Sequence, residues 1–185
     1  MSIVKVSGNA SGTGTFEIAA PNSNTNRTLT LPDNTGTLIS TGSTFAGNGP
    51  AFAATGTSAQ SFGSGTWTKI IFQTETYDTN SCYDNVTNYR FTPTTAGYYQ
   101  MNLAMHANEA GAGGTTLRTA FYRNGTAFTN LQVRDGVGQP VNMSQSVLIY
   151  CNGTTDYIEV YGFASVGTFV GSAERYFSGS LARVA

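Results

Sequence analysis

The stretch NYRFTPTTAGYYQMNLAMHA, residues 88–107, has the clearest periodicity in the chain and predicts its fold class. In its second half, large apolar side chains alternate with polar or small ones. A repeat of two residues is typical of a β-strand that buries one of its two faces. One predicted face carries Tyr99, Met101, Leu103 and Met105, and the other carries Tyr98, Gln100, Asn102, Ala104 and His106.

Composition and turn signals extend this prediction to the rest of the chain. The 185 residues include 10 Tyr and 11 Phe, and only 10% of the residues are charged. Aromatic and β-branched residues favour strands. Turns are marked by Asn48-Gly49, Asn124-Gly125, Asp135-Gly136 and Asn152-Gly153. Short strands separated by such turns predict an all-β fold, a jelly-roll β-sandwich.

The sequence predicts two parts, an N-terminal arm of residues 1–44 and a knob of residues 45–185. Within the arm, TLTLPDNTGTL (28–38) predicts a β-hairpin, and residues 40–50 form a brief linker. A lone hairpin is marginally stable, and the arm has too few large apolar residues to offset its ordering entropy. We expect the arm to pack on its own copies, on the knob or on another protein. Its expected anchors are Phe16, Ile18, Leu29, Leu31, Leu38 and Ile39.

Residues 50–185 resemble the complement C1q and tumour-necrosis-factor (TNF) family. The matching segments occur in the family's order: PAFAA (50–54), WTKIIF (67–72), AFYRNGTA (120–127) and YFSGSLARV (176–184). Tyr83-Asp84, Phe91, Pro93, Gly97, Tyr98 and Tyr99 fit the family's central pattern. The resemblance implies a ten-strand jelly roll that forms compact homotrimers. The sequence shows no acidic cluster for calcium, so we expect neither a metal nor another cofactor.

Residues 12–39 resemble a repeat of tailed-phage structural proteins, above all tail fibres. Its mark is T-L-P-D-x-T-G-T-L, present here as TLPDNTGTL. An arm of this kind joined to a trimeric knob implies a protein of the virion surface, assembled in the host cytoplasm.

Charge and hydropathy argue against nucleic acid and membranes as partners. The formal net charge is −1, so the sequence provides no basic field for nucleic acid. The first residues have no apolar core of a secretory signal, and no apolar run is long enough to insert into a membrane. Cys82 and Cys151 are far apart in sequence, and we expect both to be reduced.

The sequence favours a non-enzymatic protein. Its single histidine, His106, would need a thiol and an orienting acid beside it for nucleophilic catalysis. The carboxylates at Asp78, Asp84, Asp135 and Asp156 could form a hydrolytic pair, but they occur near turns, where Asp is common.

The aromatic residues have two interpretations, subunit contact or sugar stacking. We favour a trimer interface that includes Tyr98, Tyr157, Tyr161 and Phe163. Both sides of strand 157–163 carry bulky groups, which predicts that a neighbouring subunit covers part of this sheet. Host polysaccharide would more readily bind exposed loops. The residues expected to contact it are Tyr77, Asp78, Asn80, Asp135 and Gln139.

Two functional hypotheses follow. In the first, the protein is a capsid decoration (cement) protein whose arms bind the major capsid protein. In the second, it is a short tail fibre that joins a tail protein and recognises the host surface. The linker 40–50 has neither heptads nor repeats to carry the knob outward, which favours decoration.

Overall fold

The computed structural model describes residues 11–15, 17, 19, 22–26, 28, 49–62, 64–110, 116–134, 141–165 and 168–185. For 107–110, 131–134 and 168–173 it describes the backbone only. The chain divides into two units, Met1–Leu38 and Ile39–Ala185. The predicted boundary at residues 44 and 45 falls outside the described residues and stays a prediction.

The described residues of the first unit are all exposed. They contain turns and irregular backbone, and the Thr25 N–H donates to Ser23 Oγ at 3.1 Å. The six predicted anchors of the arm lie outside the described residues, as does most of the predicted hairpin.

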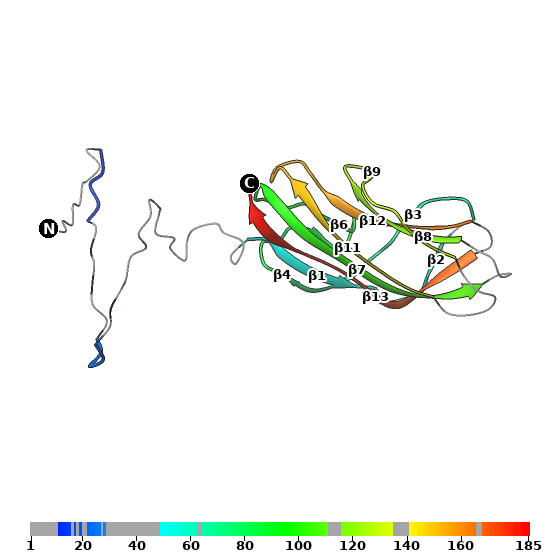
Figure 1. Cartoon of the computed structure of the whole chain (residues 1–185), viewed down its shortest axis with the longest axis horizontal. Helices are drawn as coiled ribbons and strands as arrows, with labels where there is room; N and C mark the ends of the chain where they lie inside the picture. Colours follow the sequence, from blue (N-terminus) through cyan, green and yellow to red (C-terminus); the bar gives the residue numbers. More distant parts are fainter. Residues whose placement is uncertain are drawn as a thin grey trace. The chain divides into compact units, whose positions relative to one another are not determined.

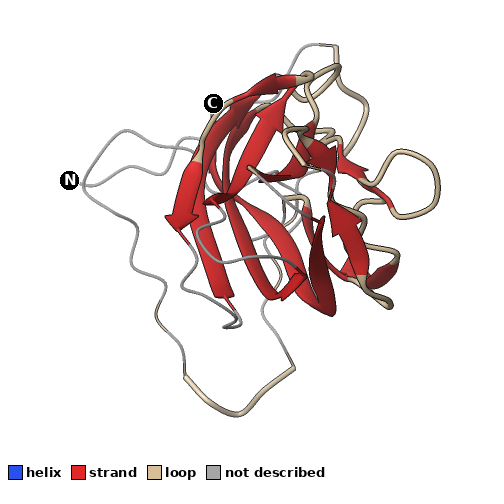
Figure 2. Cartoon of the chain, turned by 90° about the vertical axis from the view of Figure 1, so that its right-hand side faces the viewer, coloured by secondary structure: helices blue, strands red, loops and turns tan. Residues whose placement is uncertain are grey.

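The second unit is a sandwich of two antiparallel sheets, shown in Figures 1 and 2. Among the described residues there are strands and no helix, which confirms the all-β prediction.

In sheet I the strand order is β11 (Val141–Cys151), β7 (Gly97–Ala110), β13 (Thr168–Val184), β1 (Ala51–Thr55) and β4 (Thr74–Asp78), with β2 (Gln60–Phe62) beside β13. In sheet II the order is β10 (Leu131–Arg134), β8 (Thr116–Arg123), β12 (Ile158–Ala164), β6 (Arg90–Phe91) and β5 (Tyr83–Asp84); β3 (Thr68–Lys69) pairs with β12, and β9 (Thr126–Ala127) with β8.

The core lies between the sheets and follows the predicted alternation on β7. Tyr99, Met101, Leu103 and Met105 are buried, whereas the intervening residues 98–106 are exposed or half-buried. An aromatic cluster fills the centre. The ring centroid of Phe52 lies 4.7 Å from that of Tyr83, 4.5 Å from that of Phe91 and 4.8 Å from that of Phe177.

Two of the predicted turns have the backbone that their sequences require. Asn124 and Gly125 both have positive φ, 53° and 75°, in the hairpin between β8 and β9. Gly153 has φ 73°, and a Cβ there would lie 2.4 Å from the backbone N of Ala96. Only glycine fits that close approach.

Thr119 of β8 is fully buried, and its hydroxyl has no hydrogen-bond partner. A buried hydroxyl without a partner costs roughly 1–3 kcal/mol. We expect Thr119→Val to raise the free energy of unfolding by about 1 kcal/mol in urea titrations. Thr129→Val is the matched control, because Thr129 Oγ1 accepts the Phe121 N–H at 3.2 Å. That variant should lose stability, and a loss in Thr119→Val would contradict the prediction.

Asp84 organises the turn between β5 and β6. Its carboxylate accepts the N–H groups of Val86 (3.0 Å), Thr87 (2.8 Å) and Asn88 (3.1 Å). The bonds from Thr87 and Val86 lower the pKa of Asp84 from 3.8 to about 2. These contacts give the Tyr83-Asp84 pair of the family pattern a structural role.

This pKa has a consequence for acid stability. Since the folded state holds the carboxylate ionised, its contribution is present above about pH 4 and is lost as the pH falls toward about 2. We expect Asp84→Asn to be less stable at pH 7 and to lose less further stability between pH 4 and pH 2. Unfolding in urea at several pH values measures both. An exposed control, Glu75→Gln, should keep the pH dependence of the unchanged chain.

Candidate functional site

The outer face of sheet I is a broad surface whose described middle carries no Asp, Glu, Lys or Arg side chain, although Glu174 lies at one end of it and Arg183 at the other. The strand registers place its members opposite one another across β11, β7, β13 and β1. We call it the neutral face. It comprises Asn142, Ser144, Ser146, Leu148 and Tyr150; Tyr98, Gln100, Asn102, Ala104 and His106; Tyr176, Ser178 and Ser180; and Ala51, Ala53 and Thr55.

Hydrogen bonds across the strands order the polar middle of this face. Gln100 Nε2 donates to Ser146 Oγ at 2.7 Å, and Ser146 Oγ donates to Asn102 Oδ1 at 2.7 Å. Near one end, His106 Nδ1 lies 2.8 Å from Asn142 Oδ1. Because these polar groups bond to one another, the face can be covered with a smaller desolvation cost.

Large apolar side chains are exposed at the end of the face near the C-terminus. Tyr98 is 41% exposed and Leu148 is 50% exposed. The rings of Tyr98 and Tyr150 lie 5.4 Å apart. Together with Arg183, Val184 and Ala185, Tyr98 and Leu148 line a hollow of about 460 Å³.

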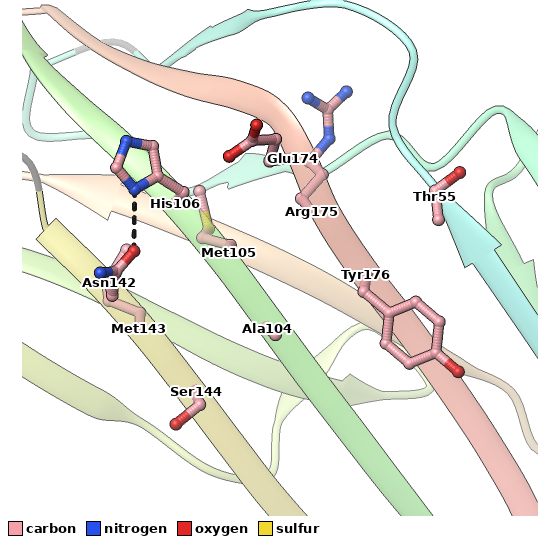
Figure 3. Close-up of a pocket in the computed structure, with 10 residues that line it drawn as sticks. All are labelled: Thr55, Ala104, Met105, His106, Asn142, Met143, Ser144, Glu174, Arg175 and Tyr176. Carbon is pink, nitrogen blue, oxygen red and sulfur yellow. Dashed lines mark hydrogen bonds between the residues drawn. The ribbon is translucent and has the colours of Figure 1, made fainter.

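A second hollow, of about 470 Å³, lies at the other end, where β1, β13, β7 and β11 run side by side (Figure 3). Its lining includes His106, Asn142 and Tyr176. Arg175 borders it but is buried, and its guanidinium donates to the carbonyl of Ile71 at 2.9 Å and to that of Ser58 at 2.7 Å. Burial lowers the pKa of Arg175. This arginine therefore ties β13 to the 58–71 segment.

The groups considered for chemistry have structural surroundings. Both cysteines are free and buried, and burial raises the pKa of Cys151 to about 12. Such a thiol is a poor nucleophile at neutral pH. Asp156 accepts from Asn124 Nδ2 at 2.6 Å and from the Asn152 N–H at 2.9 Å. Across the described segments, no three His, Cys, Asp or Glu side chains gather as a metal site would require.

The predicted interface residues do not share one face. Tyr98 belongs to sheet I, whereas Tyr161 and Phe163 lie on β12 of sheet II and Tyr157 directly precedes that strand. The ring of Phe163 lies 5.3 Å from that of Trp67, and the ring of Tyr161 lies 4.1 Å from that of Tyr122. Side chains of the same chain thus cover part of the surface that the sequence assigned to a neighbouring subunit.

The predicted glycan loop is described in part. Tyr77 is 47% exposed at the end of β4. The Asp78 carboxylate accepts the Tyr83 N–H at 2.6 Å and the Asn80 N–H at 3.3 Å, so it shapes its own loop. Asp135 and Gln139 lie outside the described residues.

Sequence reasoning missed Leu148, Tyr150 and Tyr176 on sheet I, and Trp67 and Tyr122 on sheet II. In strand 141–151 the apolar Val141, Met143 and Ile149 alternate with outward-facing residues. This repeat of two residues could have predicted which side chains of the strand belong to the neutral face. The aromatic contacts on sheet II join β8, β12 and the residue before β3, which are distant in sequence, so no local sequence pattern predicts these contacts.

No helix long and apolar enough to cross a membrane occurs in the described part of the chain.

No protein-family model and no curated protein sequence matches the chain. The globular domain of a zebrafish complement 1qA protein superposes with a TM-score of 0.55 and 15% identity, over 74% of this chain and 99% of that one. Murine APRIL superposes with a TM-score of 0.55 and 8% identity, over 72% and 98%. The PRD1 vertex protein P5 aligns over 73% and 98% at 14% identity, but its TM-score of 0.47 supports no argument. The chain therefore has the C1q/TNF-like jelly-roll fold.

Proposed function

We propose that this chain is a non-enzymatic structural protein of a phage virion surface. In this proposal it is a homotrimeric capsid decoration protein. Its arm, residues 1–44, docks on the major capsid protein, and its knob, residues 45–185, projects outward.

The neutral face is the observation that carries self-association. Interface cores are depleted of charged residues and enriched in tyrosine. Tyr98, Leu148 and Tyr176 are 41%, 50% and 39% exposed on a face whose polar groups already bond to one another. Covering the middle of this face removes apolar area from water and buries no charged side chain, because Glu174 and Arg183 lie toward its two ends. The trimer is the state that the family resemblance implies.

The arm supports the virion role. Its sequence TLPDNTGTL resembles the phage repeat, and the described residues of the first unit are exposed. Three arms on one trimer would release only when all three detach, so weak contacts would add up to firm attachment. The six apolar anchors, from Phe16 to Ile39, are the residues proposed to make these contacts.

The alternative is a short tail fibre or receptor-binding protein. The same TLPDNTGTL segment favours it, because the repeat that it resembles occurs above all in tail fibres. The short linker 40–50 favours decoration, since it provides no stalk.

Copy number per particle separates the two roles. Quantitative mass spectrometry of purified virions compares this chain with the major capsid protein. Copies of the same order as the capsid protein support decoration, whereas a few tens or fewer support a tail fibre. Absence from the particle rejects both.

A second experiment tests the arm. The full chain with Leu29→Ser and Leu31→Ser should bind stripped particles far more weakly and remain an oligomer. Binding that equals that of the unchanged chain rejects the docking role of these residues.

A further inference from the structure

The outer face of sheet II carries four half-buried aromatic side chains that contact one another. Trp67 precedes β3, Tyr122 lies on β8, and Tyr161 and Phe163 lie on β12. The ring of Trp67 is 5.3 Å from that of Phe163 and 6.0 Å from that of Tyr122, and Tyr122 is 4.1 Å from Tyr161. We call these four residues the aromatic platform. Their mutual packing fixes the rings in place before any partner arrives.

The register explains why these rings meet. Phe163 and Tyr161 of β12 lie opposite Arg118 and Ala120 of β8, and Tyr161 lies opposite Lys69 of β3. The small Ala120 leaves room between the larger side chains on either side of it. The platform is therefore built by two neighbouring strands, β8 and β12, and by the residue that precedes β3.

Arg118 contacts a ring of the platform, and Arg90 lies farther along the same sheet, over Tyr157, which is outside the platform. The guanidinium of Arg118 lies 5.4 Å from the centre of the Phe163 ring, and that of Arg90 lies 4.3 Å from the centre of the Tyr157 ring. Lys69 is paired with the buried carboxylate of Glu159 at 2.5 Å. The charge of Glu159 is thus compensated within the face.

The two arginines have no such compensation. Within the described part of the chain, no carboxylate lies at ion-pair distance from Arg118 or Arg90. Asp84 lies opposite Arg90 in the register, but its oxygens accept the N–H groups of its own turn. A chain of net charge −1 therefore presents a local excess of positive charge beside stacked rings.

We propose that the aromatic platform binds an acidic polysaccharide, a polymer of uronic-acid sugars. The C–H faces of pyranose rings would stack on the aromatic rings, whose faces are electron-rich. The sugar carboxylates would pair with Arg118 and Arg90, since a guanidinium matches the geometry of a carboxylate. This inference requires neither the virion role nor the trimer.

A hydroxyl of the platform suits the same ligand. Burial raises the pKa of the Tyr122 hydroxyl, which can donate a hydrogen bond to a ligand. Burial and the carboxylate of Glu159, to which the Tyr161 hydroxyl is hydrogen-bonded, raise the pKa of Tyr161. Combined stacking, hydrogen bonding and charge pairing distinguish this face from the neutral face of sheet I. Uncharged apolar partners would leave the arginine charges desolvated.

The single tryptophan of the chain makes the test specific to this site. Trp67 is part of the platform, so its fluorescence reports binding there directly. We expect alginate oligosaccharides, which are uronic-acid polymers, to change the emission of the full chain saturably. Raising NaCl from about 50 to 500 mM should weaken this binding at least threefold, because salt screens the charge pairs. Dextran, a neutral polysaccharide, should have no effect.

Variants identify the residues. Arg118→Gln should weaken alginate binding about tenfold, and Arg118→Lys should retain more of it. Arg183→Gln is the matched control, because Arg183 is exposed on sheet I, and it should bind alginate unchanged. Phe163→Ala, with its unfolding midpoint checked, provides a second test that removes stacking and keeps the charge.

Several results would overturn the inference. They are no response to alginate, an equal response to dextran, and unchanged binding in both Arg118→Gln and Phe163→Ala. A Trp67 emission that shifts on protein dilution without responding to alginate would assign the platform to a subunit contact instead. The oligomeric mass measured on the same samples tests self-association separately, so either proposal can fail alone.

Discussion

Replacing Leu148 with aspartate is expected to convert the proposed trimer into single chains. Leu148 is 50% exposed in the isolated chain, so the substitution removes little core contact. In the trimer, however, each copy would bury a carboxylate on the neutral face, and Arg183, the cation that lines the same hollow, is exposed and would have to lose its own water to pair with that carboxylate. Burial of an unpaired charge costs several kcal/mol. Association should weaken by roughly a thousandfold or more.

Sedimentation equilibrium checks this result over a range of protein concentrations. The unchanged chain should have the mass of three chains, and Leu148→Asp the mass of one. Val86→Asp is the matched control, because Val86 is 73% exposed on the turn between β5 and β6, away from the neutral face. A trimer that persists in Leu148→Asp would place the contact elsewhere. Tyr161→Asp would then test the interface on sheet II that the sequence predicted.

Much of the knob could be predicted because its signals are local. The alternation over Tyr99–Met105 determines which side of β7 faces the core, whatever the rest of the chain does. The Asn124-Gly125 turn encodes its hairpin through positive φ at both residues. The family's terminal pattern also has a physical basis. Phe177 and Leu181 enter the core, and a Cβ at position 179 would lie 2.7 Å from Met101 Sδ.

The candidate sites were harder to predict, because they depend on which strands become neighbours. The sequence identified Tyr161 and Phe163 as unusual for an outward face, but it could not identify Trp67 and Tyr122 as their cover. Likewise, Tyr98 and Leu148 are 50 positions apart and meet through the pairing of Gln100 with Leu148 on adjacent strands. A period of two predicts the face of a strand, whereas strand order requires the whole topology.

Phe177→Ala should cause the largest loss of stability among the substitutions considered. Phe177 lies on β13, at the middle of sheet I, and is fully buried. Its ring centroid lies 4.8 Å from that of Phe52, 5.4 Å from that of Phe72 and 6.0 Å from that of Phe121. Truncation removes transfer free energy and leaves a cavity that these rigid rings cannot fill. Such changes cost roughly 3–5 kcal/mol.

The cost should be high because Phe177 joins both sheets. Phe52 and Phe72 reach it from one part of the core, and Phe121 reaches it from β8 of the opposite sheet. Urea unfolding at a single protein concentration measures the loss, since association also stabilises the folded state. Phe128→Ala is the control, because Phe128 is 47% exposed and should lose less than about 1 kcal/mol. A loss below about 1.5 kcal/mol in Phe177→Ala would mean that the two sheets close over the cavity, contrary to a rigid aromatic core.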